Sequence, residues 1–215
     1  MIYYNIHTHQ PSENTDEAAI ISLDIRELPS LKTNLYYSAG IHPRYADRDM
    51  AELLYTIAKK PFVVAIGEAG LDKRTDTRWE LQKDIFLFQI NLAEELQKPL
   101  IIHSVKAWQE LIAIHKISKP AVPWIIHGFR GKGELARQLI QSGFYLSFGR
   151  YYQTKALFEA WNSNRLFVET DDKEICIQEI YISISSTLGI AEEALSNEIS
   201  SHMQSWPSPP FCTEK

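Results

Sequence analysis

The sequence predicts an α/β fold in which eight parallel strands, most of them joined by helices, close into a distorted (β/α)8 barrel. Two observations support this: short apolar runs recur eight times along the 215 residues, and longer amphipathic segments separate most of them. Such an alternation is typical of parallel strands with helical crossovers, and eight strands favour a closed barrel over an open sheet. The length is near the lower limit for such barrels, which typically have about 250 residues. We therefore expect one domain spanning residues 1–215.

The predicted strands are apolar runs too short for helices, bounded by polar or turn-forming residues. In chain order they are Ile2–Ile6, Ala18–Ile25, Leu35–Ile41, Phe62–Ile66, Leu100–His103, Val122–His127, Phe144–Phe148 and Leu166–Val168. The predicted helices are Asp49–Lys59, Arg78–Gln97, Val105–Ile117, Gly133–Ser142, Thr154–Trp161, Glu174–Leu188 and Ala191–Gln204. The last two follow the final strand, so they are additional to the barrel.

The segment Arg78–Gln97 has the strongest helical pattern. Its apolar residues recur at helical spacing and so predict one buried stripe: Leu81, Ile85, Phe88, Leu92 and Leu96. Pro99 ends this helix, and Pro61 ends the helix before it in the same way.

The first two crossovers are predicted to be abbreviated. About eleven residues, mostly polar, separate Ile6 from Ala18, and the link from Ile25 to Leu35, which contains Pro29, is equally short. Parallel neighbours usually need a dozen or more connecting residues. A crossover helix of normal length therefore does not fit in either link.

Composition limits the possible partners. The net charge of −5 argues against a broad electrostatic surface for nucleic acid. It leaves a local basic surface possible, because several cations follow predicted strand ends: Arg44, Lys73, Arg74, Arg130, Lys132 and Arg150. The alternative, that these are ordinary solvated loop charges, stays open.

The chain has no stretch of 18 apolar residues and no basic region followed by an apolar signal core, which predicts a cytoplasmic protein without a membrane partner. In that compartment the two cysteines, Cys176 and Cys212, are expected to be free thiols rather than a disulfide.

Metal-ligating side chains stand at or just past the C-terminal ends of five predicted strands. They are His7, His9, Glu68, His103, His127 and Asp171. His7 and His9 share one face of an extended strand, so both can reach one cation. Any one histidine alone would be better explained as a hydrogen-bonded core residue. Together they predict a convergent site, because catalytic groups of a barrel gather at the C-terminal ends of its strands.

Imidazoles combined with carboxylates suit zinc, manganese, magnesium or iron, without selecting one. A divalent cation lowers the pKa of bound water, and two cations about 3.5–4 Å apart can hold both the attacking and the leaving oxygen. Asp171 is placed to act as general base or to orient that water. The predicted chemistry is hydrolysis by phosphoryl or acyl transfer to water.

Six motifs occur in a fixed order: N-I-H-T-H, G-I-H-P, G-E-A-G-L-D, P-L-I-I-H-S, H-G-F-R-G and E-T-D. Between Tyr4 and Asp171 this ordered set resembles the TatD family of metal-dependent deoxyribonucleases, which are amidohydrolase-like TIM barrels. The resemblance implies a single hydrolase domain with two divalent metal ions that cleaves phosphodiester bonds of DNA.

The resemblance also implies individual roles. His7, His9 and Asp171 would hold one ion, His103 and His127 the other, and Glu68 would lie between the two. Asp171, Glu68 and His42 of G-I-H-P would be catalytic. Contacts to the substrate are expected from His42 and from the cations near the ligands, namely Arg44, Lys73, Arg74 and Arg130.

The sequence departs from the family pattern around these ligands. Asn5 stands where the family usually has aspartate, and Val105 stands where it usually has arginine. The loop after E-T-D is also shortened. These departures leave two alternatives to a deoxyribonuclease: a small-molecule amidohydrolase or phosphoesterase, and a metal-binding protein with little activity.

Overall fold

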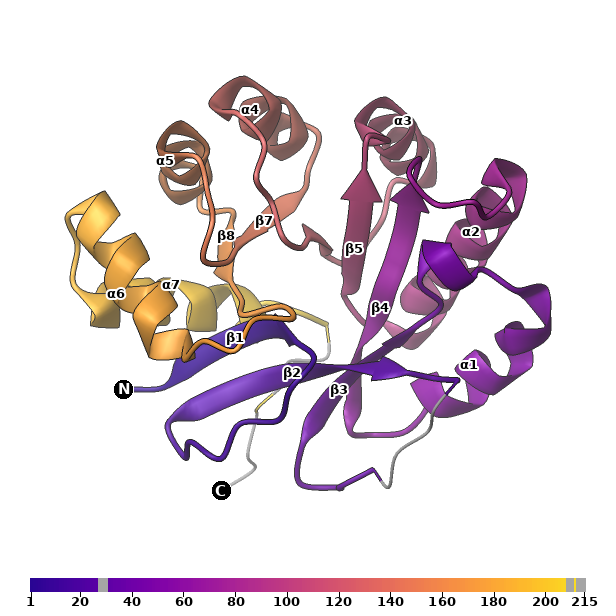
Figure 1. Cartoon of the computed structure of the whole chain (residues 1–215), viewed down its shortest axis with the longest axis horizontal. Coiled ribbons are helices and arrows are strands. Elements are labelled where there is room, and N and C mark those ends of the chain that lie inside the picture. Colours follow the sequence, from indigo (N-terminus) through magenta and orange to yellow (C-terminus); the bar gives the residue numbers. More distant parts are fainter. Residues whose placement is uncertain (27–30, 208–210, 212–215) are drawn as a thin grey trace.

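The computed structural model describes residues 1–26, 31–207 and 211. Within these residues, eight parallel strands form one sheet, and each strand pairs with the next in sequence. They are β1 (Tyr3–Thr8), β2 (Glu17–Asp24), β3 (Tyr36–Gly40), β4 (Val63–Asp72), β5 (Leu100–Val105), β6 (Trp124–Ile126), β7 (Tyr145–Phe148) and β8 (Leu166–Val168). An isolated parallel bridge between Thr8 and Asp171 joins the end of β8 to β1. The prediction of a distorted barrel is therefore confirmed (Figure 1).

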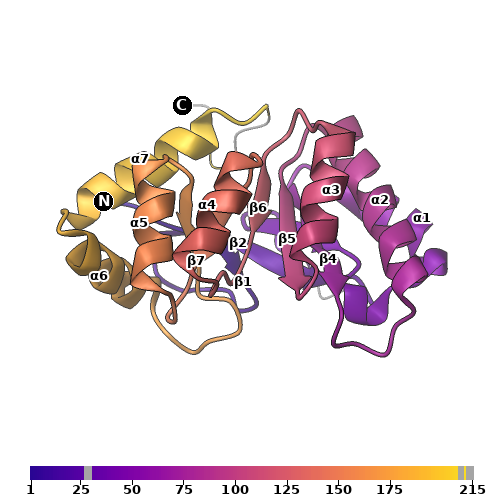
Figure 2. The ribbon, with the colours of Figure 1, turned by 90° about the horizontal axis from the view of Figure 1, so that it is seen from above.

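The helices follow one another around the outside of the strands (Figure 2). They are α1 (Ala51–Ala58), α2 (Trp79–Leu96), α3 (Trp108–Ser118), α4 (Gly133–Gln141), α5 (Thr154–Asn162), α6 (Ile177–Leu188) and α7 (Glu192–Gln204), with short 3-10 turns η1 (Pro43–Tyr45) and η2 (Arg48–Met50). No helix among the described residues lies between β1 and β2 or between β2 and β3 in the chain. The first two crossovers are thus abbreviated as predicted, although Pro29 falls outside the described residues.

The two C-terminal helices pack against β1. The Tyr181 hydroxyl on α6 donates to the Tyr4 carbonyl oxygen at 3.2 Å and accepts from the Tyr4 N–H at 3.0 Å. On α7, the Ser196 hydroxyl donates to the carbonyl oxygen of Ile2 at 2.6 Å. These helices therefore cover one of the two strands that have no crossover helix directly after them.

Strand β4 is longer than predicted, because it continues past Ile66 to Asp72. Its register with β5 shifts between Ile66 and Ala69, and Glu68 lies within this irregular stretch rather than after the strand. A Cβ atom on Gly70 would lie 1.9 Å from the carbonyl oxygen of His103, so glycine is required for the two strands to approach this closely. Extension of β5 to Val105 also delays α3, which begins at Trp108.

The buried stripe of α2 differs in part from the predicted one. Ile85 and Leu92 are buried as expected, but the other buried positions are Gln82, Phe86, Gln89, Ile90 and Ala93. Leu81, Phe88 and Leu96 are only partly buried. The reason is hydrogen bonding. Both glutamine side chains turn inward to bind backbone groups at the ends of the strands, where an unpaired backbone group would be costly.

None of the described helices is both long and apolar enough to cross a membrane. The cytoplasmic location stays a prediction. Cys176 is exposed, and Cys212 lies outside the described residues, so the expectation of two free thiols stays a prediction as well.

Candidate metal centre

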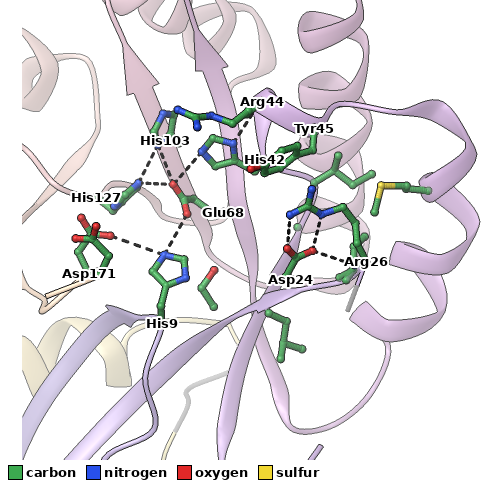
Figure 3. Close-up of a pocket in the computed structure, with 17 residues that line it drawn as sticks. His9, Asp24, Arg26, His42, Arg44, Tyr45, Glu68, His103, His127 and Asp171 are labelled. Carbon is green, nitrogen blue, oxygen red and sulfur yellow. Dashed lines mark hydrogen bonds and ion pairs between the residues drawn. The ribbon is translucent and has the colours of Figure 1, made fainter. Parts of the chain in front are cut away.

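Glu68 lies at the middle of a cluster of histidines at the C-terminal end of the barrel (Figure 3). Its Oε1 atom is 2.8 Å from His103 Nδ1, 2.8 Å from His127 Nε2 and 3.4 Å from His42 Nε2. We call Oε1 and these three histidines the Oε1 side. Strands β4 and β5, the loop after β6 and the turn before η1 bring them together.

The other oxygen of Glu68 faces a second group, which we call the Oε2 side. Glu68 Oε2 is 3.7 Å from Nε2 of His7 and 3.7 Å from Nε2 of His9. Asp171 Oδ1 lies 3.7 Å from the first of these nitrogens and 3.8 Å from the second. The structure therefore brings together all six predicted ligands, with the Glu68 carboxylate between two donor groups.

Closure of the barrel places Asp171 in this group. Its backbone N–H donates to the carbonyl oxygen of His7 at 3.1 Å, and the His9 N–H donates to the carbonyl oxygen of Asp171 at 3.1 Å. Asp171 has a φ of 58°, a left-handed conformation that aspartate tolerates better than most residues. The bridge between the first and last strands thus positions a carboxylate beside the two histidines of β1.

Two further carboxylates, for which the motifs predicted no role, lie behind the histidines of the Oε1 side. Asp72 Oδ2 is 3.3 Å from His103 Nε2. Glu169 Oε1 is 3.5 Å from His127 Nδ1 and accepts the Gly128 N–H at 2.6 Å. Such partners fix the ring orientation of a metal-binding histidine. Their positions inside the G-E-A-G-L-D and E-T-D motifs were a signal that could have identified them.

Buried glutamines of α2 hold the same region from outside. Gln82 Oε1 accepts the Asp72 N–H at 2.8 Å, and its amide donates to the Asp72 carbonyl oxygen at 3.1 Å. Gln89 forms the same pair of bonds with Ile41, at 2.7 and 3.0 Å. Ile41 precedes His42, so α2 positions the backbone next to two side chains of the cluster.

Asn5 is buried but does not face the cluster with its side chain. Its amide donates to Glu17 Oε1 at 2.8 Å and to Thr170 Oγ1 at 2.9 Å, while its oxygen accepts the Thr170 N–H at 3.2 Å. Asn5, which differs from the family pattern, therefore links β1 to β2 and to the end of β8. An aspartate could not make the first of these bonds.

The charges of the cluster are strongly coupled. Burial alone would raise the pKa of Glu68, but the charge of His127 and hydrogen bonds from the Oε1-side histidines lower it well below its usual value. Burial alone would lower the pKa of His127, but Glu68 and Glu169 raise it well above its usual value. The structure therefore favours an ion pair between Glu68 and His127.

The pKa values of the Oε2 side are shifted differently. Burial and the nearby His127 charge lower the pKa of His7 to about 3, which leaves a neutral imidazole. Burial raises the pKa of the Asp171 carboxyl, which is 22% exposed. His9 is more open, with 40% of its side chain exposed.

The donor atoms suit a divalent cation. Ligands at about 2.1 Å from a tetrahedral ion lie about 3.4 Å from one another, close to the 3.7–3.8 Å spacings of the Oε2 side. The buried Nε2 of His7 has no hydrogen-bond partner among the described residues, as expected of a metal-binding nitrogen. On the Oε1 side the 2.8 Å contacts would have to open before a cation could enter.

The structure places the residues that were predicted to contact the substrate in different regions. Arg44 lines the same cavity of about 520 Å³ as His42, together with Asp24, Arg26 and Tyr45. Lys73 and Arg74 do not line this cavity; Lys73 forms an ion pair with Glu110. Arg130 lies at a second cavity, beside the loop after β7. In Figure 3 the paired side chains of Asp24 and Arg26 lie at the opposite end of the cavity from Asp171.

Comparisons with known proteins found a matching family model and several relatives. A family model described as TatD related DNase matches residues 12–174. The uncharacterised metal-dependent hydrolase YabD of Bacillus subtilis is 36% identical over 149 residues, covering 64% of this chain and 58% of the relative. The 3'-5' ssDNA/RNA exonuclease TatD of Klebsiella pneumoniae is 29% identical over 162 residues, covering 70% and 62%. The chain thus spans about three fifths of the length of these curated relatives.

Two crystal structures have the same fold. The TatD homologue YJJV of Escherichia coli has a TM-score of 0.78 at 17% identity, covering 94% of this chain and 96% of its own. A TatD family hydrolase of Entamoeba histolytica has a TM-score of 0.74 at 18% identity, covering 96% and 98%.

Proposed function

Because the chain belongs to the TatD related DNase family, we propose that it is a metal-dependent hydrolase that cleaves phosphodiester bonds of DNA. We further propose that it binds two divalent cations, one on each side of Glu68. A Klebsiella relative is named as an exonuclease of single-stranded DNA and RNA, which supports a polynucleotide substrate.

The observation that supports this proposal most strongly is that the two oxygens of one carboxylate face two different donor groups. Glu68 directs Oε1 towards His103 and His127, and Oε2 towards His7 and His9. A carboxylate in this position is suited to bridge two cations. Bound divalent cations would supply Lewis acidity and lower the pKa of water.

We assign the base to Asp171. It borders the cavity, and burial raises its pKa, so its carboxyl group can take a proton more readily than a fully solvated aspartate. Its Oδ1 is held 3.7 Å from His7 Nε2 by the backbone bonds of the bridge. It can therefore orient a water molecule on the Oε2 side and accept its proton.

We assign substrate binding to His42. Its Nδ1 accepts the Arg44 N–H at 3.0 Å, so in the neutral ring the proton is on Nε2. That N–H lies 3.4 Å from Glu68 Oε1 and borders the cavity. It can donate to an oxygen of a phosphodiester held beside Glu68, with the Arg44 guanidinium on the same wall.

The test combines metal analysis with a substrate screen. Purified protein would be loaded with manganese, magnesium or zinc, and its bound metal measured by mass spectrometry. Hydrolysis of a DNA oligonucleotide, a duplex and p-nitrophenyl phosphate would then be compared. We expect two cations per chain and cleavage of DNA. Cleavage of the monoester alone would favour the small-molecule phosphoesterase instead, and failure of every metal to bind would overturn the proposal.

The role of Asp171 is tested in the same assay. Asp171→Ala should lower kcat by about 10³-fold or more, because both a ligand and the base are removed. The matched control is Asp76→Ala, an exposed aspartate beyond β4 that does not line the cavity. Equal activity of the two variants would exclude the assigned role.

A further inference from the structure

A second cavity of about 420 Å³ lies at the loops that follow β6 and β7. It is lined by Arg130, Arg150, Tyr151, Tyr152, Gln153 and Ser183. The proposed hydrolysis makes no use of these residues beyond the predicted contact from Arg130. Their arrangement has three features that point to a polyanionic ligand.

The first feature is location. Arg130 comes three residues after His127, so its Cα lies within about 11 Å of that of His127. The Phe129 N–H donates to the Ser147 carbonyl oxygen at 2.9 Å, which holds the loop after β6 alongside β7. Arg150 and Tyr151 directly follow the end of β7. Residues that line the cavity thus follow two strands of the barrel closely, and one of them is only three residues from a proposed ligand.

The second feature is an aromatic ring held open to solvent. Tyr151 is 55% exposed, so much of its ring is open to solvent. Its neighbour Tyr152 is fixed, because its hydroxyl lies 2.9 Å from Ser183 Oγ and 2.8 Å from Thr187 Oγ1 on α6. This anchor holds the loop in place, so the exposed ring is positioned in advance.

The third feature is unneutralised charge. The Cζ atoms of Arg130 and Arg150 lie 5.6 and 5.7 Å from the centre of the Tyr151 ring. Neither guanidinium is paired with a carboxylate in the described part of the chain. Arg26, by contrast, is paired with Asp24 and stacks at 3.5 Å on the ring of Tyr45. In a chain with a net charge of −5, two unpaired arginines around one ring form a local positive site.

We propose that Arg130, Arg150 and Tyr151 form a strand-binding site for a nucleotide adjacent to the cleaved one. The guanidiniums bind phosphate oxygens, and a base takes the place of a guanidinium that lies over the ring of Tyr151 in the free protein. Stacking needs an unpaired base, so the site selects single-stranded over duplex DNA. This inference rests on the proposed function and specifies that the DNA bound by the enzyme is single-stranded.

The test uses the metal-loaded protein and two substrates of different length. Tyr151→Ala should raise KM for a single-stranded oligonucleotide by about 5- to 100-fold. It should leave hydrolysis of bis(p-nitrophenyl) phosphate unchanged, since that diester has no adjacent nucleotide to occupy the cavity. Tyr151→Phe, which keeps the ring, should behave as the wild type. Phe158→Ala on α5 removes another exposed aromatic ring and serves as the control.

The charge is tested separately. The double variant Arg130→Gln/Arg150→Gln should reduce the slope of log Kd against log salt by about 1.4, because each phosphate that is no longer neutralised accounts for about 0.7. Arg137→Gln, whose arginine is already paired with Glu159, is the matched control and should not change the slope.

Binding of a fluorescent oligonucleotide with the metal chelated separates the two proposals. If the wild type cleaves neither substrate, the proposed function fails, yet weaker binding by Tyr151→Ala still supports the strand-binding site. Unchanged oligonucleotide binding in Tyr151→Ala and in the double arginine variant would overturn the site, as would an equal loss on both substrates.

Discussion

The two sides of Glu68 carry similar ligands but are supported differently. On the Oε1 side, His103 and His127 contact the carboxylate at 2.8 Å and each has a carboxylate behind its other nitrogen. On the Oε2 side, the facing atoms are 3.7–3.8 Å apart, and among the described residues no carboxylate oxygen lies within 4 Å of Nδ1 of His7. The ligands of the Oε1 side are therefore in direct contact and supported by carboxylates. The ligands of the Oε2 side are already far enough apart to surround a cation.

The sheet explains this difference. The Oε1 side is built on β4 and β5, whose pairing continues as far as Asp72 and Val105. The Oε2 side lies where an isolated bridge joins the two ends of the barrel, beside the abbreviated crossovers. The long pairing of β4 with β5 brings Asp72 behind His103, and Glu169, which directly follows β8, lies behind His127. The closure supplies Asp171 but no comparable support.

The largest effect should come from removing what both sides share. Glu68→Gln keeps the shape but lowers the charge available to each cation, so we expect kcat to fall by about 10³-fold or more. Binding of both cations should be weakened, as measured by metal content after dialysis. Glu80→Gln, an exposed change on α2, is the control. Loss of one cation alone would show that Glu68 does not serve both sides.

The supporting carboxylates should matter next. Glu169→Gln and Asp72→Asn should each weaken cation binding on the Oε1 side by about 10- to 100-fold, because the histidine rings lose their orienting partner. Titration of the metal-free protein with zinc, followed by calorimetry, would measure this. The Oε2-side affinity should stay within error. If both affinities fell together, the two sides would be one coupled site rather than two differently supported ones.

Spacing should determine the order of binding. The Oε2 side needs little ligand movement, whereas the Oε1 side must open its hydrogen bonds. This opening costs about 1 kcal/mol or more, which corresponds to roughly fivefold or more in affinity. His9→Ala should therefore remove the tighter binding step, and His103→Ala the weaker one. The reverse assignment in a calorimetric titration would contradict the role given to spacing.

The smallest effect concerns Asn5 beside the Oε2 side. Asn5→Asp would place a carboxylate 2.8 Å from Glu17 Oε1 and remove the donor to Thr170, so the free energy of unfolding should fall by about 1 kcal/mol. Denaturation with urea measures this change. Glu17→Gln in the same chain should restore stability by relieving the repulsion. A neutral Asn5→Asp would mean that these bonds do not stabilise the end of β8.

The sequence alone was sufficient for the strand order and for the convergence of the six predicted ligands. The reason is geometric: parallel strands of one barrel end on the same face, so polar residues that follow apolar runs must converge there. The motifs also placed His42 correctly, since the short turn before η1 directly follows β3. Even the abbreviated crossovers could be read from the number of residues available.

Tertiary structure decided the contacts between residues far apart in the chain. Burial of Gln82 and Gln89 depends on backbone groups of Asp72 in β4 and of Ile41 just after β3, which α2 meets after folding and which helical spacing of apolar residues does not encode. The division of Glu68 between two donor groups likewise depends on the irregular stretch of β4.

The basic residues show the same limit. Lys73 and Arg130 both follow strand ends, yet one is neutralised by Glu110 on α3 and the other remains unpaired beside Tyr151 among the described residues. The sequence determined which charges stand at the mouth of the barrel. Only the packing of the surrounding helices and loops decided which of them remain available to a ligand, because the charge of a side chain is encoded locally whereas its partner is not.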